Sequence, residues 1–348
     1  MNLWCDIDKN LLNENIKRIK ELTNKPLISV VKSNGYGLGI KNVSKAIEEN
    51  IDVFAVASLE EAKALDTNKD ILIMTPVCTL SEIHRNNYIY TVDSTNDIDL
   101  FNGDITYRVH IYIDTGMNRL GLSYSEVYKI IKKIKEEKNN IIIEGIYTHL
   151  HNTNNIKKTM RQIDILKELY NSMPEIKHWH CLNSKGILIE KLREYASWTT
   201  MVRAGNILYG YDGISHGFKK VFNIKAKVVK EYFIKENGYI GYGSKFKIKK
   251  GTRVGIIECG IINKFGCTLE IKNSFIINIL KAIKKSFKPH NNVFYNKIAL
   301  ELLCTPNMNC SIISLDKIGY EIRNNIVVEI PISPILLDSS IPRILNEN

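Results

Sequence analysis

The chain has 348 residues, of which 44% are hydrophobic and 24% charged, with a formal net charge of +11. This length allows one large and one smaller domain, and the composition excludes disordered and collagen-like chains. Basic residues are interleaved with isoleucine in stretches such as 131–138 and 245–250, which is typical of solvated surfaces. We therefore expect no nucleic-acid partner.

Cysteine usage and hydropathy indicate the compartment. The seven cysteines are scattered and contain no Cys-x-x-Cys pair, which favours a reducing environment over a disulfide framework or a zinc site. The N-terminal residues carry acids where a signal peptide needs an apolar core, and no run of about 18 apolar residues occurs. We expect a cytoplasmic protein without a membrane partner.

The first two thirds of the chain alternate β-branched runs with helix-like stretches. Apolar residues at helical spacing precede the first run, and capping boxes at Ser58 and Ser123 predict later helices. Eight alternations within roughly 200 residues predict an α/β fold, a (β/α)8 TIM-like barrel. The predicted strands are 27–32, 52–57, 71–75, 88–92, 107–114, 141–149, 178–182 and 201–208.

The remaining third has a different pattern. Strand-like segments predominate, with one helix predicted at 276–287. We predict a barrel domain over 10–225 and a β-rich domain over 226–348, which residues 1–9 join. The predicted strands of the β-rich domain are 254–259, 297–304, 311–315 and 326–332.

Lys32 lies at the end of the first predicted strand, before a glycine-rich segment. At a barrel mouth a desolvated lysine amine can form a Schiff base with a carbonyl compound. The alternative is a surface lysine followed by a strand-to-helix turn. Gly35, Gly37 and Gly39 do not have the G-x-G-x-x-G spacing of dinucleotide-binding loops.

Basic residues lie in or after three further predicted strands. Arg119 follows the predicted strand 107–114, His149 ends 141–149, and Arg203 lies in 201–208 beside glycine amides. Because the carboxyl ends of barrel strands meet at one mouth, these cations predict a site for a phosphorylated ligand.

The ordered set of these segments resembles the alanine racemase family along essentially the whole chain. The resemblance implies pyridoxal phosphate held by the barrel, a small amino-acid substrate interconverted between its L and D forms, and a homodimer. In that dimer the β domain of one subunit completes the site of the other. The matching segments are Trp4 with DID, LLNENI, 32–39, DTGMNRLG, GIYTH, Asn183 with Ser184, VRAGNILYG and 240–260.

Site roles follow from this resemblance residue by residue. Lys32 matches the lysine that bonds the cofactor and acts as one of two bases, and Tyr36 matches a phosphate contact. Arg119 matches the arginine on the cofactor's phenolic oxygen and near the substrate, and His149 the histidine that packs on the ring.

The phosphate and ring-nitrogen contacts are implied in the same way. Ser184 and the amides of Gly205 and Asn206 match the phosphate cradle, and Arg203 matches the arginine facing the ring nitrogen. An arginine keeps its proton at neutral pH, so that nitrogen should stay unprotonated, which disfavours a decarboxylase.

The partner-contributed half of the family's site departs from the pattern. The second base of the family is a tyrosine, but its position here is Ile261, which has no exchangeable proton. The substrate loop is 307–310, where Met308 is the candidate substrate contact. Tyr112 stands where some members have a carbamylated lysine, Leu38 replaces a usual histidine, and a late phosphate-supporting tyrosine has no clear equivalent.

Three explanations of Ile261 remain open. Cys259 or Cys267 could serve as the second base if its thiol pKa were lowered, or either could be an inert core cysteine. Lys32 could act alone on one face, giving proton exchange or slow transamination. The chain could also be a cofactor-binding relative with a regulatory or structural role.

A metal-dependent barrel hydrolase is the alternative from another class. His149 with His151, and His178 with His180, alternate along strands so that each pair shares a face. Such pairs can bind a metal with Asp164 or Asp114 nearby. The match of His149 to a cofactor contact disfavours this reading, and we predict no metal.

Overall fold

The structure is a computed structural model that describes residues 1–76, 84–267, 292–319 and 325–347. It divides into two compact units, one containing Asp8–Val221 and the other Met1–Ile7 with Phe222–Asn346. The helix predicted at 276–287 and Cys78 lie outside the described residues. Among the described residues, no helix is long and apolar enough to cross a membrane.

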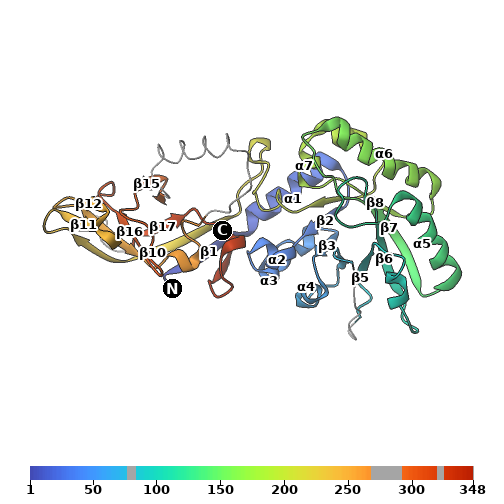
Figure 1. Ribbon diagram of the computed structural model, residues 1–348, viewed down its shortest axis with the longest axis horizontal. Coiled ribbons are helices and arrows are strands. Elements are labelled where there is room, and N and C mark those ends of the chain that lie inside the picture. The colour runs from blue at the N-terminus through green and yellow to red at the C-terminus, as the bar shows by residue number, and fades with distance from the viewer. Residues whose placement is uncertain (77–83, 268–291, 320–324, 348) are drawn as a thin grey trace. The chain divides into compact units, whose positions relative to one another are not determined.

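The first unit contains an eight-stranded parallel sheet that curls into a nearly closed barrel (Figure 1). All eight predicted strands are confirmed. Backbone bonds from Arg203 N–H to the Leu182 carbonyl (3.0 Å) and from Met201 N–H to the Trp179 carbonyl (3.3 Å) bring the two ends of the sheet together. The strands are β2 (Leu27–Val30), β3 (Val53–Val56), β4 (Asp70–Ile73), β5 (Tyr88–Val92), β6 (Tyr107–Tyr112), β7 (Ile141–Tyr147), β8 (His178–His180) and β9 (Val202–Ala204).

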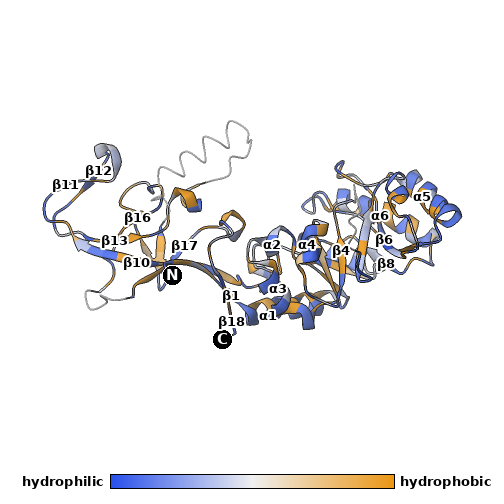
Figure 2. Ribbon diagram, turned by 90° about the horizontal axis from the view of Figure 1, so that it is seen from below, coloured by the Kyte–Doolittle hydropathy of each residue, from blue (hydrophilic) through white to orange (hydrophobic). Residues whose placement is uncertain are grey.

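Helices cover the barrel strands from outside. Figure 2 shows hydrophobic and hydrophilic residues alternating along α5 and α6, as expected for helices that bury one face. On α5 the buried residues are Val127, Ile130, Ile131 and Ile134. The helices are α1 (Lys9–Thr23), α2 (Lys32–Tyr36), α3 (Ile40–Ile47), α4 (Leu59–Ala64), α5 (Tyr124–Glu137), α6 (Ile156–Ser172), α7 (Ser184–Leu188) and α8 (Glu190–Tyr195).

One predicted capping box is confirmed and the other is only half formed. At α5 the Glu126 carboxylate accepts hydrogen bonds from the Ser123 backbone N–H (2.7 Å) and hydroxyl (2.6 Å). At α4 the Ser58 hydroxyl accepts from the Glu61 N–H (3.3 Å), but the Glu61 carboxylate accepts from the N–H groups of Ala57 and Asn34 instead. Glu61 therefore connects α4 to the loop that carries Lys32.

The barrel interior is a packed core. Strands β2 and β3 are buried along their whole length, as expected when helices cover a parallel sheet. Full burial of each such aliphatic side chain stabilises the fold by about 1.5–3 kcal/mol. One core cluster comprises Ile28, Val30, Val53, Ala55, Leu72, Ile89 and Met201.

The second unit is built of antiparallel strands. The long strand β10 pairs with β1, β13 and β17, and β11 pairs with β12 in a separate ribbon (Figure 1). Each predicted strand overlaps an observed one. The strands are β1 (Leu3–Asp8), β10 (Phe222–Phe233), β11 (Gly238–Ile240), β12 (Phe246–Ile248), β13 (Arg253–Ile257), β14 (Val293–Tyr295), β15 (Ile298–Leu300), β16 (Ser311–Ser314), β17 (Val327–Ile330) and β18 (Arg343–Asn346).

Candidate active site

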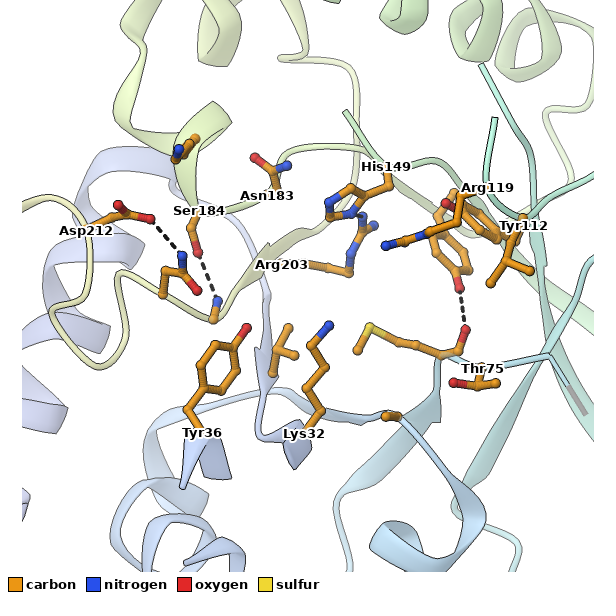
Figure 3. Close-up of a pocket in the computed structure, with 18 residues that line it drawn as sticks. Lys32, Tyr36, Thr75, Tyr112, Arg119, His149, Asn183, Ser184, Arg203 and Asp212 are labelled. Atoms are coloured by element: carbon orange, nitrogen blue, oxygen red, sulfur yellow. Dashed lines mark hydrogen bonds between the residues drawn. The ribbon is translucent and has the colours of Figure 1, made fainter. Parts of the chain in front are cut away.

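A pocket of about 500 Å³ lies at the carboxyl ends of the barrel strands (Figure 3). This is the end at which barrel enzymes assemble their sites. The pocket brings together eight residues that the sequence singled out: Lys32, Tyr36, Arg119, His149, Ser184, Arg203, Gly205 and Asn206. Met308, which lies between β15 and β16 of the second unit, is 65% exposed and is not among the lining residues.

The backbone that follows Lys32 winds in the left-handed sense. Ser33, Asn34 and Gly35 have φ values of 54°, 54° and 63°, a conformation that costs L residues roughly 1–2 kcal/mol each. Several hydrogen bonds hold it, including Gly35 N–H to the Val31 carbonyl (2.8 Å) and Asn34 N–H to the Glu61 carboxylate (3.1 Å). The surrounding structure thus fixes the position from which the Lys32 side chain enters the pocket.

The pocket environment favours the neutral amine of Lys32. Burial removes water from the ammonium group and lowers its pKa, and the positive charges of Arg119 and Arg203 act in the same direction. Glu61 opposes this shift. A lysine with a lowered pKa is a better nucleophile toward a carbonyl carbon at neutral pH.

One end of the pocket is rich in hydroxyl and amide groups. The Gly205 N–H donates to the Ser184 hydroxyl (3.0 Å), and a Cβ at Gly205 would lie 2.2 Å from the Tyr36 hydroxyl oxygen. Only glycine therefore lets this backbone approach Tyr36. Burial, reinforced by Asp212, raises the pKa of Tyr36 to about 12, so its hydroxyl keeps its proton. Such a group of donors fits a phosphate.

Arg203 lines the pocket, is buried and has no carboxylate partner among the described residues. Its guanidinium donates to His180 Nδ1 (2.5 Å) and to the Thr148 carbonyl (2.8 Å), and it lies 4.9 Å over the Tyr147 ring. Because a guanidinium can only donate, His180 Nδ1 must accept, which places the His180 proton on Nε2. That Nε2 faces His110 Nδ1 at 3.0 Å. The Arg203 charge thus has only neutral acceptors around it.

The family follows from comparison of the sequence with known proteins. The family model for the N-terminal domain of alanine racemase matches residues 7–213 of the chain. The chain belongs to the alanine racemase family. Alanine racemase of Helicobacter pylori strain Shi470 is 30% identical over 284 residues, covering 74% of this chain and 75% of that protein. Alanine racemase of Fusobacterium nucleatum is 29% identical over 275 residues, covering 75% and 76%.

Solved structures show the alanine racemase fold over the whole chain. The crystal structure of alanine racemase from Bacillus anthracis with bound L-Ala-P has a TM-score of 0.79 at 20% identity, covering 100% of this chain and 96% of that one. Alanine racemase of Clostridium difficile 630 has the same TM-score at 21% identity, covering 100% and 96%. The family resemblance and the fold predicted from the sequence are confirmed.

The two segments that depart from the alanine racemase pattern meet in the second unit. The Ile261 and Ile262 N–H groups donate to the Asn307 and Met308 carbonyls (2.9 and 3.0 Å). Ile261 is 47% exposed. The neighbouring Cys259 is buried, which raises its thiol pKa to about 12, opposite to the shift that a cysteine base requires. Cys267 is exposed.

Among the described residues, the histidine pairs are not gathered with a third metal-ligating side chain. His180 is engaged by Arg203 and His110, while the Asp114 carboxylate accepts from two backbone N–H groups of its own turn. Asp164 accepts from the Tyr195 hydroxyl. Within the described ranges, no group of three His, Cys, Asp or Glu residues has the arrangement to hold a metal ion. The hydrolase alternative therefore has no ligand set in this part of the chain.

Sequence reasoning missed several lining residues. Thr75 follows β4, Tyr147 ends β7, and Asp212 accepts a hydrogen bond from the Asn206 side chain (2.8 Å). Thr75 and Tyr147 could have been found from their positions at strand ends. Asp212 lies beyond the last barrel strand and gave no such signal.

We expect the buried histidines to make stability depend on pH. Burial lowers the pKa of His110 from 6.5 to about 3, so the unfolded state binds a proton that the folded state does not. The free energy of unfolding is therefore highest above about pH 6.5 and falls as the pH is lowered. For His110 the loss between pH 7 and pH 5 is about 2 kcal/mol. Urea unfolding of the parent and His110→Gln at both pH values measures it.

The drop between pH 7 and pH 5 should be smaller by about 2 kcal/mol in His110→Gln than in the parent. The exposed His216 supplies the control, since His216→Gln should keep the parent's pH dependence. An equal drop in all three proteins would contradict a neutral, buried His110.

Proposed function

We propose that this chain is a pyridoxal phosphate-dependent amino-acid racemase that acts on alanine or another small amino acid, as a cytoplasmic homodimer with shared sites. The observation that carries the proposal is the convergence in one pocket of a desolvated Lys32 amine, a donor-rich end at Gly205 and the Arg203 charge, which has no carboxylate partner among the described residues. The names of the curated relatives support it. Sedimentation of the active protein as a stable monomer would contradict the shared-site arrangement.

The residues present fit the cofactor. When bound, pyridoxal phosphate links to an amine and makes the α-hydrogen of an amino acid acidic. The Ser184 and Tyr36 hydroxyls and the amides of Gly205 and Asn206 would hold its phosphate. Arg119 would contact its phenolic oxygen and His149 its ring. The close approach of Tyr36 to Gly205, which a Cβ would block, supports the phosphate assignment.

Lys32 and Arg203 would have distinct roles. Lys32 would remove and return the α-proton on one face, since its lowered pKa leaves more of the amine unprotonated. Arg203 would face the ring nitrogen as a donor that does not release its proton. The hydrogen bonds that the guanidinium donates to His180 Nδ1 and the Thr148 carbonyl hold it in place and add no negative charge.

A second candidate rests on Ile261. Isoleucine cannot move a proton on the opposite face. Burial raises the pKa of the Cys259 thiol, which disfavours Cys259 as a replacement base, while Cys267 is exposed. A homologue that binds the cofactor but exchanges the α-proton with retention, performs another cofactor-dependent reaction or serves in regulation would have this pattern. Its barrel pocket would be kept while its second base is lost.

Isotope exchange separates the two candidates. The protein is incubated with cofactor and L-alanine, or separately D-alanine, in heavy water, and deuterium at the α-carbon is followed with the enantiomer ratio. We expect deuterium in the opposite enantiomer. Deuterium with retained configuration would favour the altered homologue, and no deuterium at all would defeat both catalytic readings.

A further inference from the structure

The pocket has two chemically different ends. In Figure 3, Tyr36 and Ser184 lie on one side of the Lys32 side chain, and Arg119 and Tyr112 lie on the other. The first end offers hydroxyl and amide donors that suit a phosphate. At the second end, Arg119 is exposed and forms no ion pair with any described residue. This end can accept a second anionic group.

Tyr112 contributes an unused donor to that second end. Its side chain lines the pocket and is only 3% exposed, and its hydroxyl has no hydrogen-bond partner among the described residues. A buried hydroxyl without a partner costs free energy, which phenylalanine would avoid in the same space. An unpaired donor at the edge of a ligand pocket is explained if a ligand supplies the acceptor.

Packing fixes where this hydroxyl lies. The Tyr112 ring stacks on Tyr147 with centroids 4.8 Å apart and planes at 13°, and Tyr147 stacks in turn on His180 at 4.7 Å. The Tyr147 hydroxyl is held by Thr91 at 3.0 Å. The stacking therefore restrains the Tyr112 ring, which reduces the conformational freedom that its hydroxyl would lose on binding a ligand.

The chain also ties Arg119 to Tyr112. The loop that carries Arg119 starts and closes at Tyr112, because the Leu122 N–H donates to the Tyr112 carbonyl (2.9 Å). Closure requires Gly121, which has φ of 112° and whose added Cβ would lie 2.5 Å from the Asp114 nitrogen. A short closed loop keeps the guanidinium at the Tyr112 end of the pocket.

We propose that Tyr112 determines substrate specificity by donating its phenolic hydrogen to the carboxylate of the bound amino acid, alongside Arg119. This inference rests on the proposed function and deepens it. A carboxylate fits because it accepts several hydrogen bonds at once and is negatively charged, which suits a cation beside a neutral donor. Amines that lack a carboxylate gain no affinity from the Tyr112 hydroxyl, because they offer it no acceptor.

Two unreactive ligands test the assignment without catalysis. One is the borohydride-reduced adduct of pyridoxal phosphate with L-alanine, and the other is the adduct with ethylamine, which lacks only the carboxylate. Calorimetry measures their binding to the full-length chain freed of cofactor. We expect Tyr112→Phe to weaken the alanine adduct about tenfold, or 1.4 kcal/mol, and to change the ethylamine adduct less than about twofold.

Tyr88→Phe is the matched control. Tyr88 also has a buried hydroxyl without a partner among the described residues, but it does not line the pocket. Both substitutions should leave the melting temperature of the cofactor-free protein unchanged or higher, and Tyr88→Phe should bind both adducts like the parent.

Several results would overturn the assignment. The first is equal affinity of the parent and Tyr112→Phe for the alanine adduct, and the second is equal weakening of both adducts by Tyr112→Phe. The third is a melting temperature lowered only by Tyr112→Phe, because this would indicate an internal partner for the hydroxyl. Failure of both adducts to bind the parent would overturn the proposed function and this inference together, and is distinguishable from the other results.

Discussion

Replacing Lys32 with alanine is expected to lower the interconversion of alanine enantiomers by about 10⁴-fold or more, equivalent to about 5.5 kcal/mol in the barrier. Lys32 is proposed both to bond the cofactor and to move the α-proton, so its loss removes a covalent step and a base together. Borohydride reduction of the parent should fix a pyridoxyl group on Lys32, and peptide mass analysis should find none in Lys32→Ala.

Lys25 provides the control. Burial lowers its pKa as it does for Lys32. However, the Lys25 amine donates hydrogen bonds to the carbonyls of Ala196 and Ser197, and Lys25 does not line the pocket. Lys25→Ala should therefore keep the label on Lys32. A label on any other lysine, or a protein that stays colourless after cofactor addition, would contradict the proposal.

Introducing tyrosine at position 261 is expected to raise inversion of alanine by about 10²-fold, since a positioned proton-transfer group contributes about 10²–10⁴-fold. Ile261 stands where the family's sequence pattern places its second base, and the side chain is 47% exposed on the surface of the second unit. Chiral chromatography of the product from L-alanine and from D-alanine measures the change.

Ile262→Tyr tests whether the position matters. Ile262 is the next residue, is 59% exposed and hydrogen-bonds through its backbone to the adjacent Met308 carbonyl. It should leave inversion within about threefold of the parent, because its side chain does not replace the missing base. An equal rise in both variants, or none in Ile261→Tyr, would indicate that another residue or another reaction is used.

Much of the barrel and its pocket could be predicted because both depend on sequence periodicity. Short β-branched runs alternating with amphipathic stretches predicted all eight barrel strands, and parallel strands in a barrel must bring their carboxyl ends together. Residues as distant as Lys32 and Arg203 could therefore be assigned to one mouth. The family resemblance rests on motifs in the same order.

Other features depend on burial and on contacts between distant segments, which sequence patterns do not contain. The left-handed turn at Ser33 and Asn34 depends on hydrogen bonds that include Glu61 of α4, which also explains why the capping box at Ser58 is only half formed.

The sequence by itself determined the barrel, the family and the set of residues at the mouth, because these follow from periodicity and residue order. Only the tertiary structure decided which side chains hold protons and which form hydrogen bonds. It raised the pKa of the Cys259 thiol by burial, placed the His180 proton on Nε2 through Arg203, and left the Tyr112 hydroxyl without a partner among the described residues. The reason is physical: desolvation and hydrogen-bond satisfaction depend on neighbours that only the folded chain brings together.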